Sequence, residues 1–417
     1  MKVFKFGGAS VNSKEAVQNM ANIVGAHKGE PLVVVVSAMG KTTNMLEQLV
    51  PGVRPKEEHP LHLEQVRNYH LRIIQGLFPD SSHPVYQDFE KLFTQLEKQT
   101  AQSPTQYNYD YDQTVCYGEL ISTTIVSHYL NSIGLKNKWV DIRQVVRTNN
   151  HYREGIVDFS ATKEASKVFQ ETDCMMYVTQ GFIAGTSDGH TTTLGREGSD
   201  YSAAILSYCL DAESMTIWKD VPGFLNADPK YFPNTVKIKQ IPYNEAIELA
   251  YYGASVIHPK TVKPIQNKNI HLHIKSFVTP EATGSVIGPF ETIQPLTPLY
   301  IFKNNQTLLS VLPKDFSFIA EENLQTIFAA LAKLNIRVNL MQNSALSFSL
   351  CIDDNELLLE QLKQLLSPQF HLRYNRGLQL ITIRYYTQQI IDTIVGGRPI
   401  LLQQRSRTTT QLLVQQK

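Results

Sequence analysis

The segment that most constrains the fold is the run from Leu32 to Val36, which is Leu-Val-Val-Val-Val. An unbroken apolar run rich in β-branched residues is typical of a strand that is buried on both faces of a parallel sheet. Residues 16–26 have the pattern of the crossover helix that a parallel sheet requires. Further strands are predicted at 139–142, 175–179 and 215–219. Since strands and helices alternate, we predict an α/β fold with a mainly parallel central sheet.

Two stretches interrupt this alternation. From Pro51, proline and glycine break the pattern, and two amphipathic helices are predicted over about 61–77 and 85–99. We interpret residues 51–115 as a helical insert in the α/β domain. The second stretch, residues 279–298, is rich in proline and glycine and is predicted to be a linker.

The elements beyond the predicted linker are smaller. A strand is predicted at 307–312, and the elements that follow it to residue 366 have the β-α-β-β-α-β order of a ferredoxin-like unit. A second such unit is predicted to begin at Leu378, with a helix at 388–395 and two strands within 399–414. Its last helix and strand are expected to be missing.

Composition limits the classes of function. The formal net charge is +1, so the chain as a whole has no charge that favours nucleic acid or an anionic membrane. Residues 373–407 are rich in arginine, but their interspersed glutamines favour a solvated strand face over a nucleic-acid surface. The longest apolar run is too short to span a bilayer, and the N-terminus has no signal-peptide pattern. Four scattered cysteines lack zinc or disulfide spacing, which favours a reducing, cytoplasmic setting.

A lysine and two glycines at the end of the first predicted strand indicate an anion site. Lys5 lies on this strand, and Gly7 and Gly8 follow directly. Two glycines permit positive φ angles, which turn successive N–H groups toward one point, and a lysine beside them adds positive charge. This arrangement suits a phosphate group. An ordinary turn with a surface lysine is the alternative, and the segment by itself leaves both open.

A second glycine-bearing loop, residues 193–200, precedes a predicted helix at 201–210. Ser199 and Asp200 at this position are good N-caps, which is the structural interpretation. The functional interpretation is that the helix N-terminus attracts an anion while Arg196 binds a carboxylate with two hydrogen bonds.

A third loop, from Ser37 to Thr43, follows the valine-rich strand. Its Gly-Lys-Thr sequence resembles the end of a P-loop motif. That motif also requires a glycine at position 35, where this sequence has Val35. The loop is still a typical ligand position, because it follows the carboxyl end of a central strand.

These motifs occur together in one family. The chain resembles aspartokinase, the ATP-dependent aspartate kinase of the amino-acid kinase superfamily, over essentially its whole length. The motifs that carry the resemblance stand in the same order along the chain: 5–10, 37–44, 118–119, 180–183, 194–200, 218–223 with 228–229, and 245–264.

The resemblance implies a particular architecture. The amino-acid kinase fold is a three-layer sandwich, expected here over residues 1–290. Ferredoxin-like ACT units, which bind amino-acid effectors and mediate dimerisation, are expected over residues 299–417, with the second unit truncated. A homodimer through this region is therefore expected.

The resemblance also implies the reaction. ATP, accompanied by Mg²⁺, would phosphorylate the side-chain carboxylate of L-aspartate in the first step of lysine, threonine and methionine biosynthesis. The implied catalytic residues are Lys5 and Asp200. The implied ATP-binding residues are Lys5, Gly7, Gly8, Lys219, Asp220, Lys230 and Ser255. The implied substrate-binding residues are Ser37, Thr43, Glu119, Arg196 and Ser199. No dedicated metal ligand is expected, nor is any nucleic-acid or membrane partner.

Four positions depart from the family pattern. Ala9 and Lys219 stand where a threonine is usual, Glu197 where a glycine is usual, and Leu225 where a tyrosine is usual. None of these changes removes a charged catalytic group. Two alternatives remain: a kinase of the same superfamily that acts on glutamate, acetylglutamate or UMP, and an inactive amino-acid sensor on the same frame.

The regulatory region departs as well. In this family the strand after the first regulatory helix usually carries an aspartate and is followed by Thr-Ser-Glu. Here the corresponding residues are Asn339 and Asn343-Ser344-Ala345, so two carboxylates that could face an effector are replaced. We therefore expect weak or absent inhibition by lysine and threonine.

Overall fold

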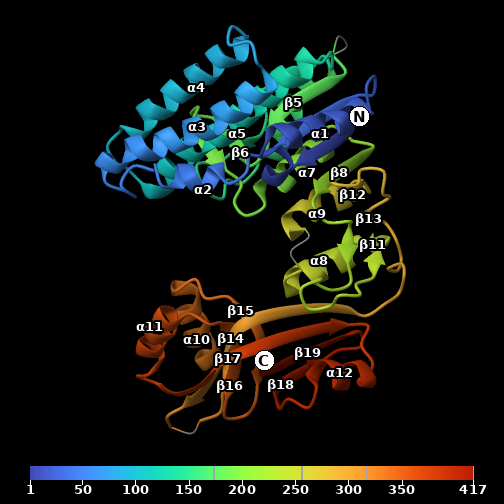
Figure 1. The fold of residues 1–417 in the computed structure, drawn as a ribbon. Helices are drawn as coiled ribbons and strands as arrows, with labels where there is room; N and C mark the ends of the chain where they lie inside the picture. Colours follow the sequence, from blue (N-terminus) through green and yellow to red (C-terminus); the bar gives the residue numbers. More distant parts are fainter. Residues whose placement is uncertain (172–173, 255–256, 316, 417) are drawn as a thin grey trace. The chain divides into compact units, whose positions relative to one another are not determined.

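The computed structural model describes residues 1–171, 174–254, 257–315 and 317–416. The chain forms two compact units (Figure 1). The first comprises 1–224, 237–247 and 255–295, and the second comprises 225–236, 248–254 and 296–417. The predicted division between 290 and 299 lies at the same place as the last of these breaks, but two short segments of the first part belong to the second unit. Within the described residues, no helix is long and apolar enough to cross a membrane.

The first unit is built on an eight-stranded sheet with the order β11-β13-β12-β8-β1-β2-β5-β3. Its strands are β1 (Lys2–Phe6), β2 (Leu32–Val36), β3 (Lys138–Val140), β5 (Met176–Gln180), β8 (Ser214–Lys219), β11 (Gln240–Pro242), β12 (His271–Ser276) and β13 (Ser285–Gly288). All neighbouring pairs are parallel except β12 with β13. The predicted mainly parallel sheet is confirmed.

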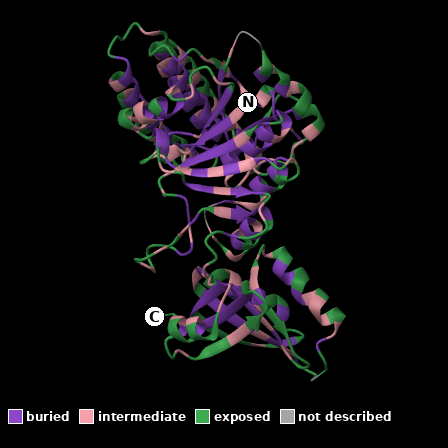
Figure 2. Cartoon of the chain, turned by 90° about the vertical axis from the view of Figure 1, so that its right-hand side faces the viewer, coloured by how far each residue is buried: buried purple, intermediate pink, exposed green. Residues whose placement is uncertain are grey.

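Strand β2 shows why the valine-rich run is diagnostic. It pairs with β1 on one side and β5 on the other, and all five of its residues are buried. Leu32, Val34 and Val36 contribute to a core with helices α1 (Lys14–Gly25) and α5 (Tyr107–Ser132). Val33 and Val35 are buried as well, and α7 (Gly198–Cys209) packs against β1, β2 and β8. Helices thus cover both faces, and the strands of the sheet are largely buried in Figure 2. The predicted three-layer sandwich is confirmed.

The helices of this part of the chain surround the sheet. They are α1 (Lys14–Gly25), α2 (Thr42–Glu47), α3 (His59–Leu77), α4 (Pro84–Thr100), α5 (Tyr107–Ser132), α6 (Phe159–Ala165), α7 (Gly198–Cys209), α8 (Tyr243–Tyr252) and α9 (Pro259–Gln266). Short strands form two further sheets. One contains β4 (Arg147–Thr148), β6 (Ile183–Thr186) and β7 (Thr191–Thr193), and the other contains β9 (Phe224–Leu225) and β10 (Lys237–Ile238). The predicted helices at 61–77 and 85–99 are confirmed as α3 and α4.

Helix α5 was not predicted from the sequence. It lies beside α4 and runs without a break through residue 115, where the helical insert was expected to end (Figure 1). Most of its residues between 110 and 130 are buried, on all sides of the helix. A helix that is buried all round has no amphipathic stripe, so its periodicity gives no signal.

The predicted linker at 279–298 is partly wrong. Residues 285–288 form β13, which lies inside the sheet between β11 and β12. Gly284, with φ +69°, precedes it, and a Cβ there would lie 2.2 Å from the carbonyl oxygen of Ile274. Glycine at this position therefore permits close approach to a neighbouring strand and does not mark a flexible connection.

The second unit contains a six-stranded antiparallel sheet with the order β15-β16-β14-β17-β19-β18. Its elements are β14 (Leu299–Pro313), α10 (Glu321–Lys333), β15 (Val338–Asn343), β16 (Phe348–Asp353), α11 (Glu356–Leu366), β17 (Phe370–Arg384), α12 (Gln388–Val395), β18 (Ile400–Arg405) and β19 (Thr409–Gln415). The first six follow the predicted β-α-β-β-α-β order.

The expectation that the second ferredoxin-like half lacks a strand is wrong. Strand β14 begins at Leu299, eight residues before the predicted start at 307, and residues 299–303 pair with residues 380–384 of β17. The first part of β14 thus joins β17, β19 and β18 as the fourth strand of this half. Helix α12 is the one helix that packs on these strands within the described chain.

Candidate active site

Four neighbouring parallel strands, β8, β1, β2 and β5, end at one edge of the first unit's sheet. A cavity of about 870 Å³ lies there. Its walls come from the segments that follow these strands, from α5 and from the start of α7. Nine predicted site residues line it: Lys5, Gly8, Ser37, Thr43, Glu119, Arg196, Ser199, Asp200 and Lys219.

The other predicted residues lie elsewhere, and their roles stay predictions. Gly7 adjoins the cavity, since a Cβ there would lie 3.4 Å from Lys5 Nζ. Asp220 is exposed at the end of β8. Lys230 is exposed in the second unit, where its backbone N–H donates to Asp228 Oδ1 at 2.9 Å. Ser255 lies outside the described residues.

Lys5 and Asp200 form a buried ion pair. Lys5 Nζ lies 2.6 Å from Asp200 Oδ1, and the exposed fractions of the two side chains are 11% and 3%. Lys219 Nζ lies 3.6 Å from the other oxygen, Asp200 Oδ2. Burial opposes the charge of Asp200, but the ammonium groups of Lys5 and Lys219 outweigh it and lower the pKa of its carboxyl. Asp200 therefore stays ionised and fixes Lys5 at the cavity wall.

Position 8 requires a glycine because no side chain would fit there, and not because its φ angle is positive. Gly7 has φ −79°, and Gly8 is not among the positive-φ glycines, so the predicted positive φ angles are wrong. A Cβ on Gly8 would lie 2.7 Å from the carbonyl oxygens of both Ala38 and Gly40. The Gly40 N–H donates to the Gly8 carbonyl oxygen at 2.9 Å. The turns after β1 and β2 thus form one compact backbone wall of the cavity.

Glu119 offers a buried oxygen to the cavity. Its Oε1 accepts a hydrogen bond from the Ala38 N–H at 3.2 Å. Its Oε2 is buried and has no hydrogen-bond partner within the described chain. Burial raises the pKa of Glu119 to about 8, although the Ala38 N–H and the nearby Lys5 partly oppose the rise. A buried carboxyl with one unused oxygen suits a ligand that brings its own positive charge.

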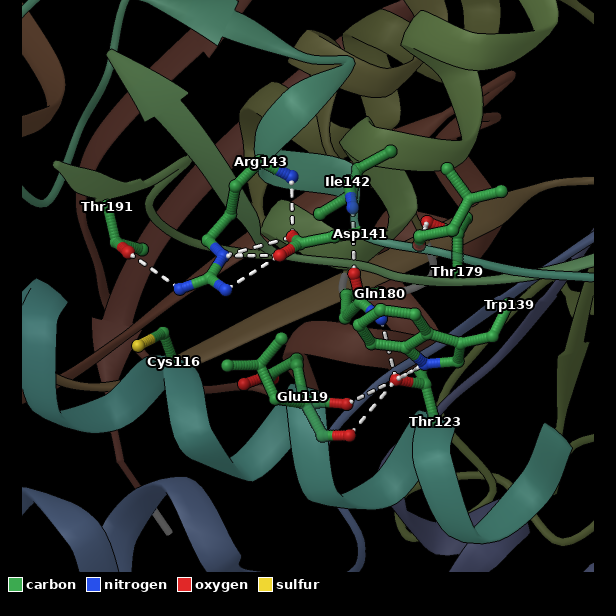
Figure 3. A network of polar contacts seen from close by, with 12 residues as sticks. Cys116, Glu119, Thr123, Trp139, Asp141, Ile142, Arg143, Thr179, Gln180 and Thr191 are labelled. Carbon is green, nitrogen blue, oxygen red and sulfur yellow. Dashed lines mark hydrogen bonds and ion pairs between the residues drawn. The ribbon is translucent and has the colours of Figure 1, made fainter. Parts of the chain in front are cut away.

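A polar network holds the helical turn that carries Glu119 (Figure 3). Thr123 Oγ1 donates to the Glu119 carbonyl oxygen at 2.8 Å. The same hydroxyl accepts from Gln180 Nε2 at 2.7 Å and from Trp139 Nε1 at 3.0 Å. Gln180 Oε1 in turn accepts from the Ile142 N–H at 2.8 Å. This network ties α5 to the ends of β3 and β5, and it gives the Gln180 motif a structural role.

The segment that leads into α7 packs tightly against Phe182. A Cβ on Gly198 would lie 2.7 Å from Phe182 Cδ2. Ser199 and Asp200 belong to the first turn of α7, which begins at Gly198. Arg196, by contrast, is exposed at the cavity rim. The loop thus combines buried groups that are held in place with one guanidinium that can reach a ligand.

Gly181→Ala is expected to lower both thermal stability and turnover. A Cβ at residue 181 would lie 2.6 Å from Ser199 Cβ, so the first turn of α7, with Asp200, would have to move. Overpacking of this kind costs about 1–3 kcal/mol of stability. Thermal unfolding and steady-state kinetics measure the two effects. Gly25→Ala is the matched control, because its Cβ would meet only Leu135 atoms, at 3.5 Å and beyond. Equal losses in both variants would contradict the prediction.

The sequence did not indicate the wall formed by residues 151–154, which also line the cavity. Buried Asp112 on α5 holds this loop: its Oδ2 accepts from the Arg153 N–H at 2.8 Å and from the Thr193 N–H at 3.0 Å. Asn108 and Tyr111 on α5 also line the cavity and were not predicted. Their residue types are common in helices, so only the tertiary contacts identify them.

Comparison with known proteins places these features in context. The model of the amino acid kinase family matches residues 1–276. Lysine-sensitive aspartokinase 3 of Escherichia coli (strain K12) is 32% identical over 400 residues, a match that covers 91% of this chain and 86% of that protein. Aspartokinase 1, chloroplastic, of Arabidopsis thaliana is 30% identical over 377 residues, which cover 87% of this chain and 65% of the plant protein.

Solved structures of aspartokinases match the whole length of this chain. The crystal structure of E. coli aspartokinase III in complex with aspartate and ADP (R-state) covers 100% of this chain and 96% of its own, with a TM-score of 0.83 at 28% identity. The same enzyme in complex with lysine and aspartate (T-state) gives a TM-score of 0.82.

Proposed function

Since this chain belongs to the amino acid kinase family and, within it, to the aspartokinases, we propose that it transfers the γ-phosphoryl group of ATP to the side-chain carboxylate of L-aspartate. The products are 4-phospho-L-aspartate and ADP. The observation that best supports this proposal is one cavity that combines the Lys5–Asp200 ion pair, a tight glycine turn and the unused buried oxygen of Glu119.

Phosphoryl transfer to a carboxylate requires that the reactants be positioned and that the phosphoryl charge be neutralised, and it does not require a general base. A carboxylate oxygen of aspartate attacks the γ-phosphorus, and the bond from phosphorus to the β,γ-bridging oxygen breaks. The attacking carboxylate is already ionised, so no proton has to be removed. The transition state is loose, and its charge lies on the peripheral phosphoryl oxygens. Lys5 neutralises part of that charge, and Asp200 keeps its ammonium in place.

Aspartate is recognised by the two charged groups on its α-carbon. The buried Oε2 of Glu119 accepts the α-ammonium group, and Arg196 at the rim binds the α-carboxylate with a planar guanidinium. Ser37, Thr43 and Ser199 add hydroxyl hydrogen-bond partners around the same cavity. An amino-acid sensor would have no use for the buried Lys5–Asp200 pair, which favours a kinase.

Magnesium is expected to arrive with ATP. Mg²⁺ prefers phosphate and water oxygens over a dedicated protein cage, and it would neutralise charge on the β- and γ-phosphates. The residues present fit such a complex, because the glycine turn leaves room for phosphate oxygens next to Lys5. Chelation of Mg²⁺ should abolish turnover, and added Mg²⁺ should restore it.

A coupled ADP-release assay with several acceptors tests the proposal. L-Aspartate, L-glutamate, N-acetyl-L-glutamate and UMP would be compared at equal concentration with the full-length protein. We expect turnover with L-aspartate and little with the others. N-Acetyl-L-glutamate and UMP lack the free α-ammonium that Glu119 accepts, and the extra methylene of L-glutamate displaces its side-chain carboxylate when its α-ammonium and α-carboxylate are bound. Preference for another acceptor, or release of ADP without an acceptor, would refute the assignment.

We also propose that the enzyme is a homodimer through the second unit and works in the cytoplasm. Members of the family with ferredoxin-like units dimerise through them, and the six-stranded sheet supplies two unpaired edges, β15 and β18. All four cysteines are free thiols, which suits a reducing compartment. Light scattering of the purified protein measures the mass in solution.

We predict that lysine and threonine inhibit weakly or not at all, although one relative is named lysine-sensitive. Asn339 is already engaged: its Oδ1 accepts from Lys303 Nζ at 3.0 Å, and its Nδ2 donates to Gln306 Oε1 and Asp353 Oδ1, each at 2.8 Å. An uncharged amide cannot neutralise an effector's ammonium, whose desolvation stays uncompensated.

Inhibition titrations with lysine and threonine on the native enzyme decide this point. Both should leave most activity at about millimolar concentration, which corresponds to weak binding. Half-inhibition by either amino acid well below that concentration would contradict the prediction. Asn339→Asp together with Ala345→Glu is the complementary variant, because it returns both carboxylates and should increase sensitivity.

A further inference from the structure

Two of the departures from the family pattern meet in the cavity. Glu197 stands where a glycine is usual, and Lys219 where a threonine is usual. They come from different elements, the loop before α7 and the end of β8, yet both line the same cavity and both lie next to Asp200. One position has gained an acidic group and the other a basic group.

Glu197 is retained at an energetic cost. Its backbone has φ 53° and ψ 30°, in the left-handed region that a glycine adopts without strain. Its Oε2 is buried and lacks a hydrogen-bond partner in the described part of the protein. A non-glycine residue held in such a conformation is strained, and residues of this kind concentrate at functional sites.

Lys219 compensates the charge of Glu197. Burial raises the pKa of the Glu197 carboxyl, and the Lys219 ammonium opposes this rise more than Arg196 or Lys5 does. Lys219 Nζ lies 3.6 Å from Asp200, against 2.6 Å for Lys5. Lys219 thus forms an ion pair with Asp200 and lines the same cavity as Glu197, and 22% of its side chain remains exposed.

The adjacent strands place the two lysines together. Strands β1 and β8 pair in parallel, with Lys5 opposite Ile217, so Lys5 and Lys219 approach Asp200 from neighbouring strand ends. Each carboxylate oxygen of Asp200 forms an ion pair with one of these lysines. Two ammonium groups thus face the same end of the cavity, where the transferring phosphoryl group is proposed to lie.

We propose that Lys219 is a second catalytic lysine, which contacts the transferring γ-phosphoryl group together with Lys5, and that Glu197 is a positioning residue that holds its ammonium toward the cavity. The proposal rests on the proposed function. It goes beyond a general contact with the nucleotide, because it assigns Lys219 to the group that is transferred. No bond to Lys219 forms. Its ammonium stabilises charge on the peripheral oxygens while the γ-phosphoryl group moves from ATP to aspartate and ADP leaves.

Steady-state kinetics on four full-length proteins test this inference: native, Lys219→Thr, Glu197→Gln and the double variant. We expect Lys219→Thr to lower kcat by about 100-fold, the typical effect of one lost transition-state contact, with the aspartate KM little changed. Glu197→Gln should lower kcat less. The double variant should match Lys219→Thr alone, because Glu197 acts through Lys219. Thermal unfolding checks that each variant is folded.

Nucleotide binding supplies a second measurement that does not depend on turnover. Calorimetry would compare MgADP with the Mg²⁺ complex of the non-hydrolysable analogue AMP-PNP, which carries a third phosphoryl group. Lys219→Thr should weaken AMP-PNP by about tenfold or more while ADP changes little, as expected for one lost charged contact. Lys275→Thr is the matched control, because Lys275 lies on the neighbouring strand over the Trp218 ring and does not line the cavity.

The outcomes are distinct. A native enzyme without aspartate kinase activity would refute the proposed function and this inference with it. An active native enzyme whose Lys219→Thr variant keeps a near-native kcat would refute the inference alone. Equal weakening of ADP and AMP-PNP would place Lys219 on another part of the nucleotide, and multiplicative losses in the double variant would show that Glu197 does not act through Lys219.

Discussion

Lys5→Met is expected to lower kcat by about 10²–10³-fold while the fold is retained, the range typical for loss of one preorganised transition-state contact. Lys5 makes the closest ion pair with Asp200 and lies beside the glycine turn that is proposed to hold phosphate oxygens. Methionine keeps most of the apolar stem and removes only the charge. Because the contact strengthens as charge develops, the loss should appear in kcat rather than in the aspartate KM.

Stability has to be separated from catalysis in this experiment. Without Lys5, Lys219 is the ion-pair partner that remains to buried Asp200 among the described residues, and an incompletely paired buried charge destabilises a fold. The double variant Lys5→Met/Asp200→Asn removes both charges and should recover thermal stability but not turnover. Lys2→Met is the matched control on the same strand, because Lys2 pairs with Glu30, away from the cavity. Near-native turnover in folded Lys5→Met would remove Lys5 from the mechanism.

Glu119→Gln is expected to raise the aspartate KM by at least about tenfold, because a hydrogen bond to a charged group contributes about 1.5–3 kcal/mol. The ATP KM should change far less, since the lost contact is to the amino acid. Glu47→Gln on α2 is a suitable control, because Glu47 accepts from Tyr107 Oη at 3.2 Å and does not line the cavity. Equal changes in both KM values would give Glu119 a structural role instead.

The pH dependence of the native enzyme follows from the same residue. With a pKa of about 8, Glu119 is mostly protonated at neutral pH in the free enzyme, whereas binding of an ammonium needs the carboxylate. The aspartate KM should therefore fall as pH rises toward about 8 and level off above it, with a proton released on binding. In Glu119→Gln the KM should stay high across the whole range.

Aspartate binding should improve as pH rises toward about 8, whereas the contribution of Glu119 to protein stability should decrease over the same range. The folded-state pKa of Glu119 lies above the ordinary value of 4.5, so the folded state holds more protons than the unfolded state between pH 4.5 and about 8. The contribution of Glu119 to stability is fully present below that window and is lost as pH rises through it. Thermal unfolding of native and Glu119→Gln protein at several pH values measures the difference, which should grow in favour of the variant toward pH 8.

Local sequence patterns were sufficient for the elements whose burial follows a simple period. The apolar run from Leu32 to Val36 predicted a central strand because both of its faces and both of its edges are covered. Helices α3 and α4 were predicted because only one side of each is buried. Charged residues next to glycines marked Lys5 and the loop from Arg196 to Asp200 as two candidate anion-binding segments.

Only the tertiary structure decided how distant segments meet. Strand β13 lies within a stretch that is rich in proline and glycine, which hides it from sequence analysis. The first part of β14 pairs with a strand about 80 residues away in sequence, and such long-range pairing is not encoded in local periodicity. The same limit applies to the cavity. Asp200 binds lysines from two strands, and Glu197 lines the same cavity as Lys219 with one carboxylate oxygen buried. Both facts depend on distances between side chains. Those distances are set by the packing of α7 against the sheet, which no single segment specifies.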